Sequence, residues 1–264
     1  MSTDGATEVS LDFYDTLGSL YDQLKANDNV QALVDLIIAA IGRTGSEPYR
    51  LLDLGCGTGS SSRAFANRGF DVTGCDNSLA LLKVARAEHP AGRYIKADIR
   101  QLPQEMTDFD IVNYTGDVPN HLLHDNDLES ALAEAARVLK PSGLVVFDVN
   151  TIGTYHHLFT TDHIIERDDT IFLWMGQTAA PEPNGLARMR LTAFYQDGPT
   201  WRRTDTMLTE RHYAPSKIER ILSNVGLRAR SVYGLYQGAL VTPADEDAHI
   251  KFVYLADKAI PMQQ

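Results

Sequence analysis

The sequence predicts a doubly wound α/β fold, in which a mostly parallel sheet follows N-terminal helices and carries an antiparallel β insertion after its fifth strand. Two observations predict it. Between about residues 50 and 150, short apolar segments alternate with amphipathic ones, as in parallel strands covered by helices on both faces. After Asn150 the segments lengthen and alternate apolar with polar residues, which is typical of an antiparallel meander. With 264 residues, 44% of them hydrophobic, residues 1–264 fit a single domain.

Residues 9–44 are expected to form N-terminal helices. Apolar and aromatic side chains recur there every three or four residues, at Leu11, Tyr14, Leu17, Tyr21 and Leu24. A second run, V-Q-A-L-V-D-L-I-I-A-A-I, has the same period and ends at Gly42. This spacing is typical of amphipathic helices.

Residues 45–155 are expected to form the core of the sheet. Apolar segments predict five strands, at residues 50–54, 70–75, 93–97, 109–114 and 144–149. Helices are predicted between them at 60–68, 78–88 and 128–139, and Ser78 can cap the second of these. Lys140-Pro141-Ser142-Gly143 predicts a turn before the fifth strand.

Residues 160–213 read as an antiparallel β insertion, because three long alternating segments are separated by glycine, proline and asparagine turns. A helix and two closing strands are expected within residues 214–260. Ligands bind at the carboxyl ends of the strands in such folds, so we expect the insertion to cover that edge as a lid.

The composition disfavours several classes of partner. There are 24 lysines and arginines against 35 acidic residues, and a net charge of −11 repels nucleic acids and anionic membranes. The first residues are polar and acidic, and no apolar run approaches the ~18 residues of a membrane span. Cys56 and Cys75 have no companion metal ligands at suitable spacing. We expect a cytoplasmic protein that binds no nucleic acid, membrane or metal, and a homodimer is compatible with this.

A glycine-rich turn follows the first predicted strand. D-L-G-C-G-T-G places Asp53 before three glycines and leads into a helix, whose N-terminus offers unpaired N–H groups to a ligand. Asp76 follows 23 residues later, where a carboxylate can accept hydrogen bonds from both hydroxyls of a ribose. The dinucleotide fingerprint needs a glycine at position 60, which is Ser60. The turn therefore predicts a nucleoside ligand and disfavours NAD.

In this order the motifs resemble those of the class I S-adenosylmethionine-dependent methyltransferases, which have a Rossmann-like fold. The five matching stretches are L-L-D-L-G-C-G-T-G, V-T-G-C-D-N-S, A-D-I-R-Q-L-P, F-D-I-V-N-Y and V-L-K-P-S-G-L-V-V-F-D-V-N-T. They cover residues 45–155. The ends of the chain resemble bacterial small-molecule methyltransferases with a β-meander lid, on the pair Tyr21-Asp22 and the stretch Glu210-Arg211-His212-Tyr213.

The resemblance implies S-adenosylmethionine as the cofactor and a set of residues to bind it. Asp76 would hold the ribose, Asp98 the adenine amino group, and Asp53 and the glycines the amino-acid portion. The full set is Tyr14, Tyr21, Asp53, Gly55, Cys56, Gly57, Asp76, Asn77, Asp98, Ile99, Tyr114 and Thr115. For Cys56 a small buried residue is the alternative, and for both Tyr14 and Tyr21 it is a core aromatic.

The acceptor side is expected in the loop T-G-D-V-P-N-H-L-L-H-D after the fourth strand. His121 and Asp117 are its proposed catalytic residues, His121 as a general base. The alternatives are a histidine that only holds the loop, and an amine acceptor that needs no base. His156, Trp174 and His212 are the expected acceptor-binding residues, with packing as the alternative for Trp174.

The function that this implies is methyl transfer to nitrogen or oxygen of a small molecule, such as an amino sugar or another specialised metabolite. Two alternatives stay open. One is a protein that binds the cofactor without transferring methyl groups, as a sensor or for other chemistry. The other, disfavoured by Ser60, is a nicotinamide-dependent oxidoreductase.

Overall fold

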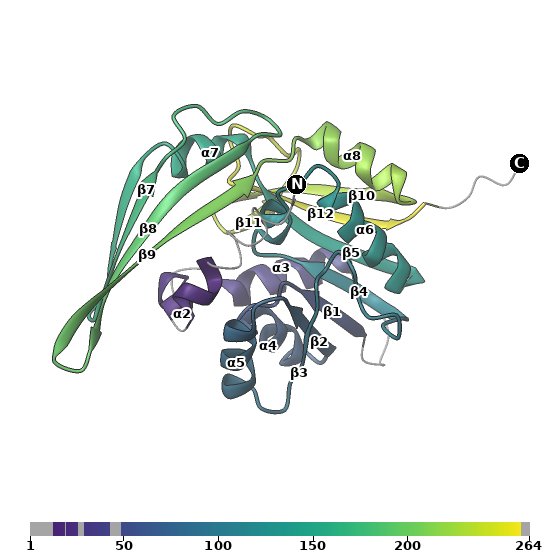
Figure 1. Ribbon diagram of the computed structural model, residues 1–264. Helices are drawn as coiled ribbons and strands as arrows, with labels where there is room; N and C mark the ends of the chain where they lie inside the picture. The colour runs from purple at the N-terminus through teal and green to yellow at the C-terminus, as the bar shows by residue number, and fades with distance from the viewer. Residues whose placement is uncertain (1–12, 19, 26–28, 43–48, 260–264) are drawn as a thin grey trace, which may run out of the picture.

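The computed structural model describes residues 13–18, 20–25, 29–42 and 49–259, and it contains two sheets with helices packed against them (Figure 1). Leu11, residues 43–48 between the N-terminal helices and the sheet, and the end of the predicted closing segment at residue 260 lie outside the described residues. No helix in the described part of the chain is long and apolar enough to cross a membrane.

The helical elements begin near the N-terminus. Residues 13–17 are helical, and the others are α2 (Leu20–Leu24), α3 (Val30–Ile41), α4 (Ser60–Ala66), α5 (Leu79–Glu88), the 3-10 helix η1 (Val118–His121), α6 (Asp127–Val138), α7 (Ile152–Leu158) and α8 (Pro215–Asn224). The strands are β1 (Arg50–Leu54), β2 (Asp71–Asp76), β3 (Arg93–Lys96), β4 (Phe109–Tyr114), β5 (Leu139–Asn150), β6 (Asp162–Glu166), β7 (Thr170–Gly176), β8 (Leu186–Asp197), β9 (Thr200–Arg211), β10 (Leu227–Tyr236), β11 (Ala239–Val241) and β12 (Lys251–Lys258).

The main sheet has eight strands in the order β11-β10-β12-β5-β4-β1-β2-β3. Strands β1 to β5 pair in parallel, and β12 and β10 add antiparallel strands at the β5 side. The predicted α/β fold is confirmed. Because the strand order reverses between β1 and β4, the carboxyl ends of these two strands form the crevice where ligands bind in such sheets.

Side chains of β5 alternate between the two faces of the sheet. Val145, Phe147 and Val149 pack with α6 and α8, whereas Leu144 and Val146 pack with α3 and α4. The strand begins at Leu139, earlier than predicted. The residues of the predicted turn are accommodated by a shift of register, in which Leu139 pairs with Phe109 but Leu144 pairs with Ile111.

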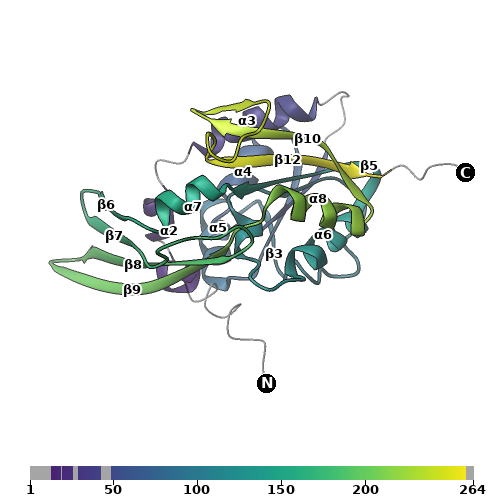
Figure 2. The same ribbon diagram turned by 90° about the horizontal axis from the view of Figure 1, so that it is seen from above.

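The second sheet is antiparallel, with strand order β6-β7-β8-β9. In β8 the alternate side chains from Ala187 to Ala193 are buried, including Met189 and Leu191. They pack against residues of the N-terminal helices and α7 such as Phe13, Leu17 and Tyr155. Figure 2 shows this sheet beside one end of the main sheet, with α2 and α7 next to it. The sheet therefore has an inner face that is directed towards the body of the protein.

Candidate functional site

The loop after β1 contains three glycines in a left-handed backbone conformation. Gly55, Gly57 and Gly59 have φ angles of 68°, 53° and 81°, which residues with a side chain rarely adopt. A Cβ atom on Gly55 would lie 2.6 Å from Cγ2 of Val118. The loop after β1 and the segment after β4 therefore touch at the crevice, and only glycine fits between them.

Asp53 holds this loop from inside the protein. Its carboxylate accepts hydrogen bonds from the hydroxyls of Ser61 (2.7 Å) and Ser62 (2.5 Å) and from the amide of Asn113 (2.7 Å). Burial raises the pKa of Asp53, and the three donors oppose that rise. Asp53 thus ties β1 to β4 and to the start of α4.

Asp76, at the end of β2, lies across from the glycine loop. Its carboxylate accepts hydrogen bonds from the backbone N–H groups of Gly57 and Ser78, each at 2.8 Å. Burial raises its pKa, and these N–H groups oppose the rise. A carboxylate offers about four acceptor positions, so two backbone donors leave Asp76 able to accept hydrogen bonds from a ligand.

Asp98 follows β3 and is paired with a cation. Arg100 donates to it, with 2.6 Å between Nη2 and Oδ2, and also donates to Asp127 at 3.0 Å. Burial alone would raise the pKa of Asp98, but the hydrogen bonds from Arg100 lower it below its usual value. Asp98 therefore remains ionised.

A first cavity, with an empty volume of ≈ 850 Å³ that is partly open to solvent, lies over the glycine loop. Eight of the twelve residues that the sequence predicted for the cofactor line it: Tyr14, Tyr21, Gly55, Gly57, Asp76, Asn77, Asp98 and Ile99. The structure thus brings together segments that are up to 85 residues apart in sequence.

The other four predicted cofactor residues lie elsewhere. Asp53 is behind the loop, and Tyr114 points to the α6 side, where its hydroxyl donates to the carbonyl of Ala131 (2.6 Å). Successive side chains of a strand point to opposite faces, so Tyr114 cannot share the direction of Asn113. Cys56 and Thr115 line an adjoining space near Asp22, which also borders Tyr21 and the glycine loop.

A second cavity, with an empty volume of ≈ 1230 Å³, adjoins the first and shares Tyr14, Tyr21 and His121 with it. Its walls come from the N-terminal helices, α7, the inner face of the antiparallel sheet and the segment before β12. Trp174, predicted to contact the acceptor, lines this cavity. The two cavities therefore meet at three side chains, two of which belong to the N-terminal helices.

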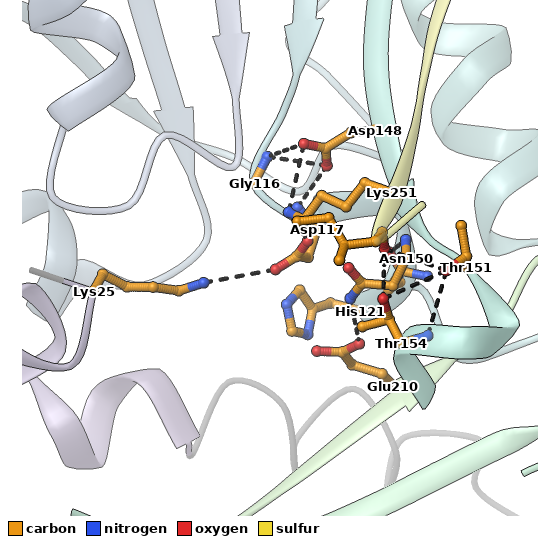
Figure 3. A network of polar contacts seen from close by, with 12 residues as sticks. Lys25, Gly116, Asp117, His121, Asp148, Asn150, Thr151, Thr154, Glu210 and Lys251 are labelled. Carbon is orange, nitrogen blue, oxygen red and sulfur yellow. Dashed lines mark hydrogen bonds and ion pairs between the residues drawn. The ribbon is translucent and has the colours of Figure 1, made fainter. Parts of the chain in front are cut away.

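A network of charged groups borders the second cavity (Figure 3). Lys251 forms ion pairs with Asp117 and with Asp148, the latter at 3.6 Å, and Lys25 pairs with Asp117 at 3.6 Å. Burial would raise the pKa of Asp117, but Lys251 and Lys25 lower it far below its usual value. Asp117 therefore stays ionised and is a poor proton acceptor.

Tyr14 and His121 meet where the cavities join. The Tyr14 hydroxyl lies 2.7 Å from Nε2 of His121. Burial lowers the pKa of His121 to about 4, although Asp117 opposes this, and burial raises the pKa of Tyr14 well above 10. Both side chains are consequently neutral at pH 7, and the tyrosine hydroxyl can donate to the imidazole.

Glu210, in β9, supplies a further carboxylate to the second cavity. It is 5% exposed and accepts a hydrogen bond from the side-chain amide of Asn150 (3.1 Å). Burial, assisted by the charge of Asp117, raises its pKa to about 7. Glu210 is thus the group of this network whose charge changes near neutral pH.

Two predicted acceptor residues do not line either cavity. Nε2 of His156 lies 3.1 Å from the carbonyl oxygen of Pro181. His212 is buried, and its Nδ1 accepts a hydrogen bond from the N–H of Asn184 (3.2 Å). Both imidazole rings therefore contact the backbone of loops rather than a cavity. The neighbouring His157 lines the second cavity.

Sequence reasoning assigned no role to Lys25, Asn150, Glu210 and Lys251. Glu210 stands in the E-R-H-Y stretch and Asn150 directly after the fifth strand, so their positions gave a usable signal. Lys251 gave none, because 134 residues separate it from its partner Asp117 and only the sheet order joins them. No group of three or more potential metal ligands occurs within the described residues.

Comparisons with known proteins agree with this geometry. The methyltransferase domain family matches residues 51–143. A provisionally named methyltransferase of Geobacillus sp. (strain WCH70) is 31% identical over 61% of this chain and 67% of that protein. An S-adenosylmethionine-dependent methyltransferase from Clostridium acetobutylicum ATCC 824 has a TM-score of 0.80 at 23% identity, over 94% of this chain and 100% of that chain. The sugar N-methyltransferase KedS8 from Streptoalloteichus sp ATCC 53650 has a TM-score of 0.68 at 18% identity, over 90% of this chain and 91% of that chain.

The chain belongs to the class I S-adenosylmethionine-dependent methyltransferases.

Proposed function

We propose that this protein transfers a methyl group from S-adenosylmethionine in the first cavity to nitrogen or oxygen of a small molecule in the second. The observation that carries the proposal is the junction of the two cavities at Tyr14, Tyr21 and His121. A methyl carbon held at that junction would lie between its donor and its acceptor. A space of ≈ 1230 Å³ that is partly open to solvent suits a small-molecule acceptor.

The residues of the first cavity fit the cofactor. Asp76 retains acceptor positions for ribose hydroxyls, and Asp98 can accept from the adenine amino group. The adjoining space between the glycine loop and Asp22 would take the amino-acid end. Asp22 already accepts a hydrogen bond from the Thr58 hydroxyl (2.6 Å), which fixes it beside the loop. When bound, the cofactor supplies a methyl carbon activated by the neighbouring sulfonium charge.

The chain's own residues would supply orientation and a dry site. The antiparallel sheet forms a wall of the second cavity and acts as a lid that excludes water, while Tyr14 and His121 hold the acceptor in line with the methyl carbon. For a hydroxyl acceptor, His121 is the proposed base, because it lies at the junction and is neutral at pH 7. Asp117 fixes Lys251 and Lys25 around the cavity and is a positioning residue.

An acceptor screen tests the proposal. The protein is incubated with methyl-labelled S-adenosylmethionine and a panel of small amines, amino sugars and alcohols, and S-adenosylhomocysteine is quantified. We expect acceptor-dependent release of S-adenosylhomocysteine with label in the acceptor. Tight cofactor binding without turnover on any acceptor would favour a binding protein. Affinity for NAD, with none for either sulfur ligand, would favour an oxidoreductase.

A further inference from the structure

Glu210 is a buried carboxylate that faces the second cavity without a cation of its own. Among the described residues its carboxylate accepts a hydrogen bond from Asn150, interacts with the Tyr155 hydroxyl and has no ion pair. Both lysines near it, Lys25 and Lys251, form ion pairs with Asp117 instead. A buried carboxylate without a paired cation is unfavourable, so the site is well suited to a ligand that brings a positive charge.

Aromatic side chains surround the same space. Phe13, Tyr14, Tyr21 and Trp174 line the cavity together with Glu210. A cation is attracted to aromatic ring faces, and this attraction grows when water is excluded. Nε1 of Trp174 is buried and has no hydrogen-bond acceptor within the described residues, so it is available to a polar substituent of the ligand. A carboxylate beside aromatic rings is complementary to an alkylammonium group with polar substituents.

We propose that Glu210 selects an amine as the methyl acceptor by binding its ammonium group and accepting its proton. The inference rests on the proposed function and names its substrate class. The proton leaves nitrogen for the carboxylate, and the freed lone pair forms the new N–C bond. The C–S bond of the cofactor breaks, and its electron pair stays on sulfur. The product is a methylated ammonium ion beside a protonated Glu210. Loss of that proton to solvent restores the carboxylate, which can hold the product together with the rings until it is released.

The titration of Glu210 agrees with this role. Its pKa of about 7 lies closer to that of an amine than the usual value of 4.5 does, so it is the stronger base. The charged groups that affect it are Asp117, which raises the pKa, and Lys25 and Lys251, which lower it. His121, at the junction of the two cavities, has a pKa of about 4 and is a weaker proton acceptor than Glu210.

Matched ligand pairs test the inference. The probes are cyclohexylamine with cyclohexanol, glucosamine with glucose, and 2-phenylethylamine with 2-phenylethanol, each titrated calorimetrically into protein saturated with S-adenosylhomocysteine. We expect at least one amine to bind ~10-fold or more tightly than its alcohol. Glu210→Gln should reduce that preference by ~10- to 100-fold, as expected for a lost hydrogen bond between charged groups. Glu210→Asp keeps the negative charge, so this variant should retain part of the preference for the amine.

Glu166→Gln is the control, because it removes one charge from an exposed position of the same antiparallel sheet and should keep the preference. Unchanged affinity for S-adenosylhomocysteine shows that each variant is folded. The absence of any amine preference in the wild type, or a preference that survives Glu210→Gln, overturns the inference. Methyl transfer to alcohols alone would overturn it while leaving the proposed function intact. Failure to bind S-adenosylhomocysteine would instead overturn the proposed function.

Discussion

Replacing Glu210 by glutamine should stabilise the protein, and the gain should depend on pH. Glu210 is buried in the free protein, where ionisation is unfavourable. Glutamine has nearly the same shape, carries no charge and can still accept the hydrogen bond that Asn150 donates. The variant therefore removes the cost of the buried charge with little change in packing.

The magnitude follows from the pKa of Glu210, which rises from 4.5 to about 7 on folding. Because the folded state binds the proton more tightly, folding takes up a proton between these two pH values. The stability of the wild type consequently falls as the pH rises from 4.5 to 7, and the loss is complete above 7. At about 1.4 kcal/mol for each pKa unit, the loss amounts to about 3 kcal/mol.

Equilibrium unfolding in urea at pH 5, 6, 7 and 8 measures this effect. The free energy of unfolding of Glu210→Gln, minus that of the wild type, should be small at pH 5 and approach about 3 kcal/mol at pH 8. The exposed control Glu166→Gln should show no such growth with pH, because solvent screens its charge. A difference that stays constant from pH 5 to 8, or that favours the wild type at pH 8, would refute a buried and destabilising carboxylate.

Four further changes probe the two cavities. Asp76→Ala should weaken S-adenosylhomocysteine binding by ~1.5–3 kcal/mol in calorimetry, and an unchanged dissociation constant would make Asp76 only a strand-end acid. Gly55→Ala should lower the free energy of unfolding by roughly 1–3 kcal/mol, since its Cβ would clash with Val118; wild-type stability would contradict that packing. If His121 is the base, His121→Ala should lower kcat by ~10²-fold or more with cofactor affinity intact. Retained activity in His121→Asn, or a turnover that follows the acceptor's own pKa whatever the histidine, would remove that role. Trp174→Ala should raise the acceptor's KM and spare kcat, so a normal KM would place the acceptor elsewhere.

The sequence was sufficient to predict the main sheet and most of the first cavity. Strand periodicity and glycine spacing are local properties, and in a parallel sheet they bring residues such as Gly57 and Asp76 to one edge. Tyr114 lies at the end of β4, as predicted, but its side chain does not point towards the cofactor cavity. Because side chains alternate along a strand, it points towards α6.

The second cavity could not be predicted to the same depth. Its charged network depends on β12 lying beside β5, which brings Lys251 next to Asp148 and Asp117 through a pairing that no local pattern specifies. Likewise, the sequence placed Glu210 at the end of a predicted strand, but no local pattern indicated that it faces a cavity bordered by the N-terminal helices. Contacts between segments far apart in the sequence, rather than local secondary-structure propensity, determine which residues line the second cavity.

The most direct test of the whole account is a single-turnover reaction of the wild type with methyl-labelled S-adenosylmethionine and the tightest-binding amine of the panel. Label and acceptor are followed together by mass spectrometry. The account predicts one labelled methyl group on the amine nitrogen for each S-adenosylhomocysteine released, and a reaction that Glu210→Gln slows while cofactor binding is unchanged. Stable binding of S-adenosylmethionine with the label never leaving the cofactor, for this amine and for every other acceptor, would contradict it.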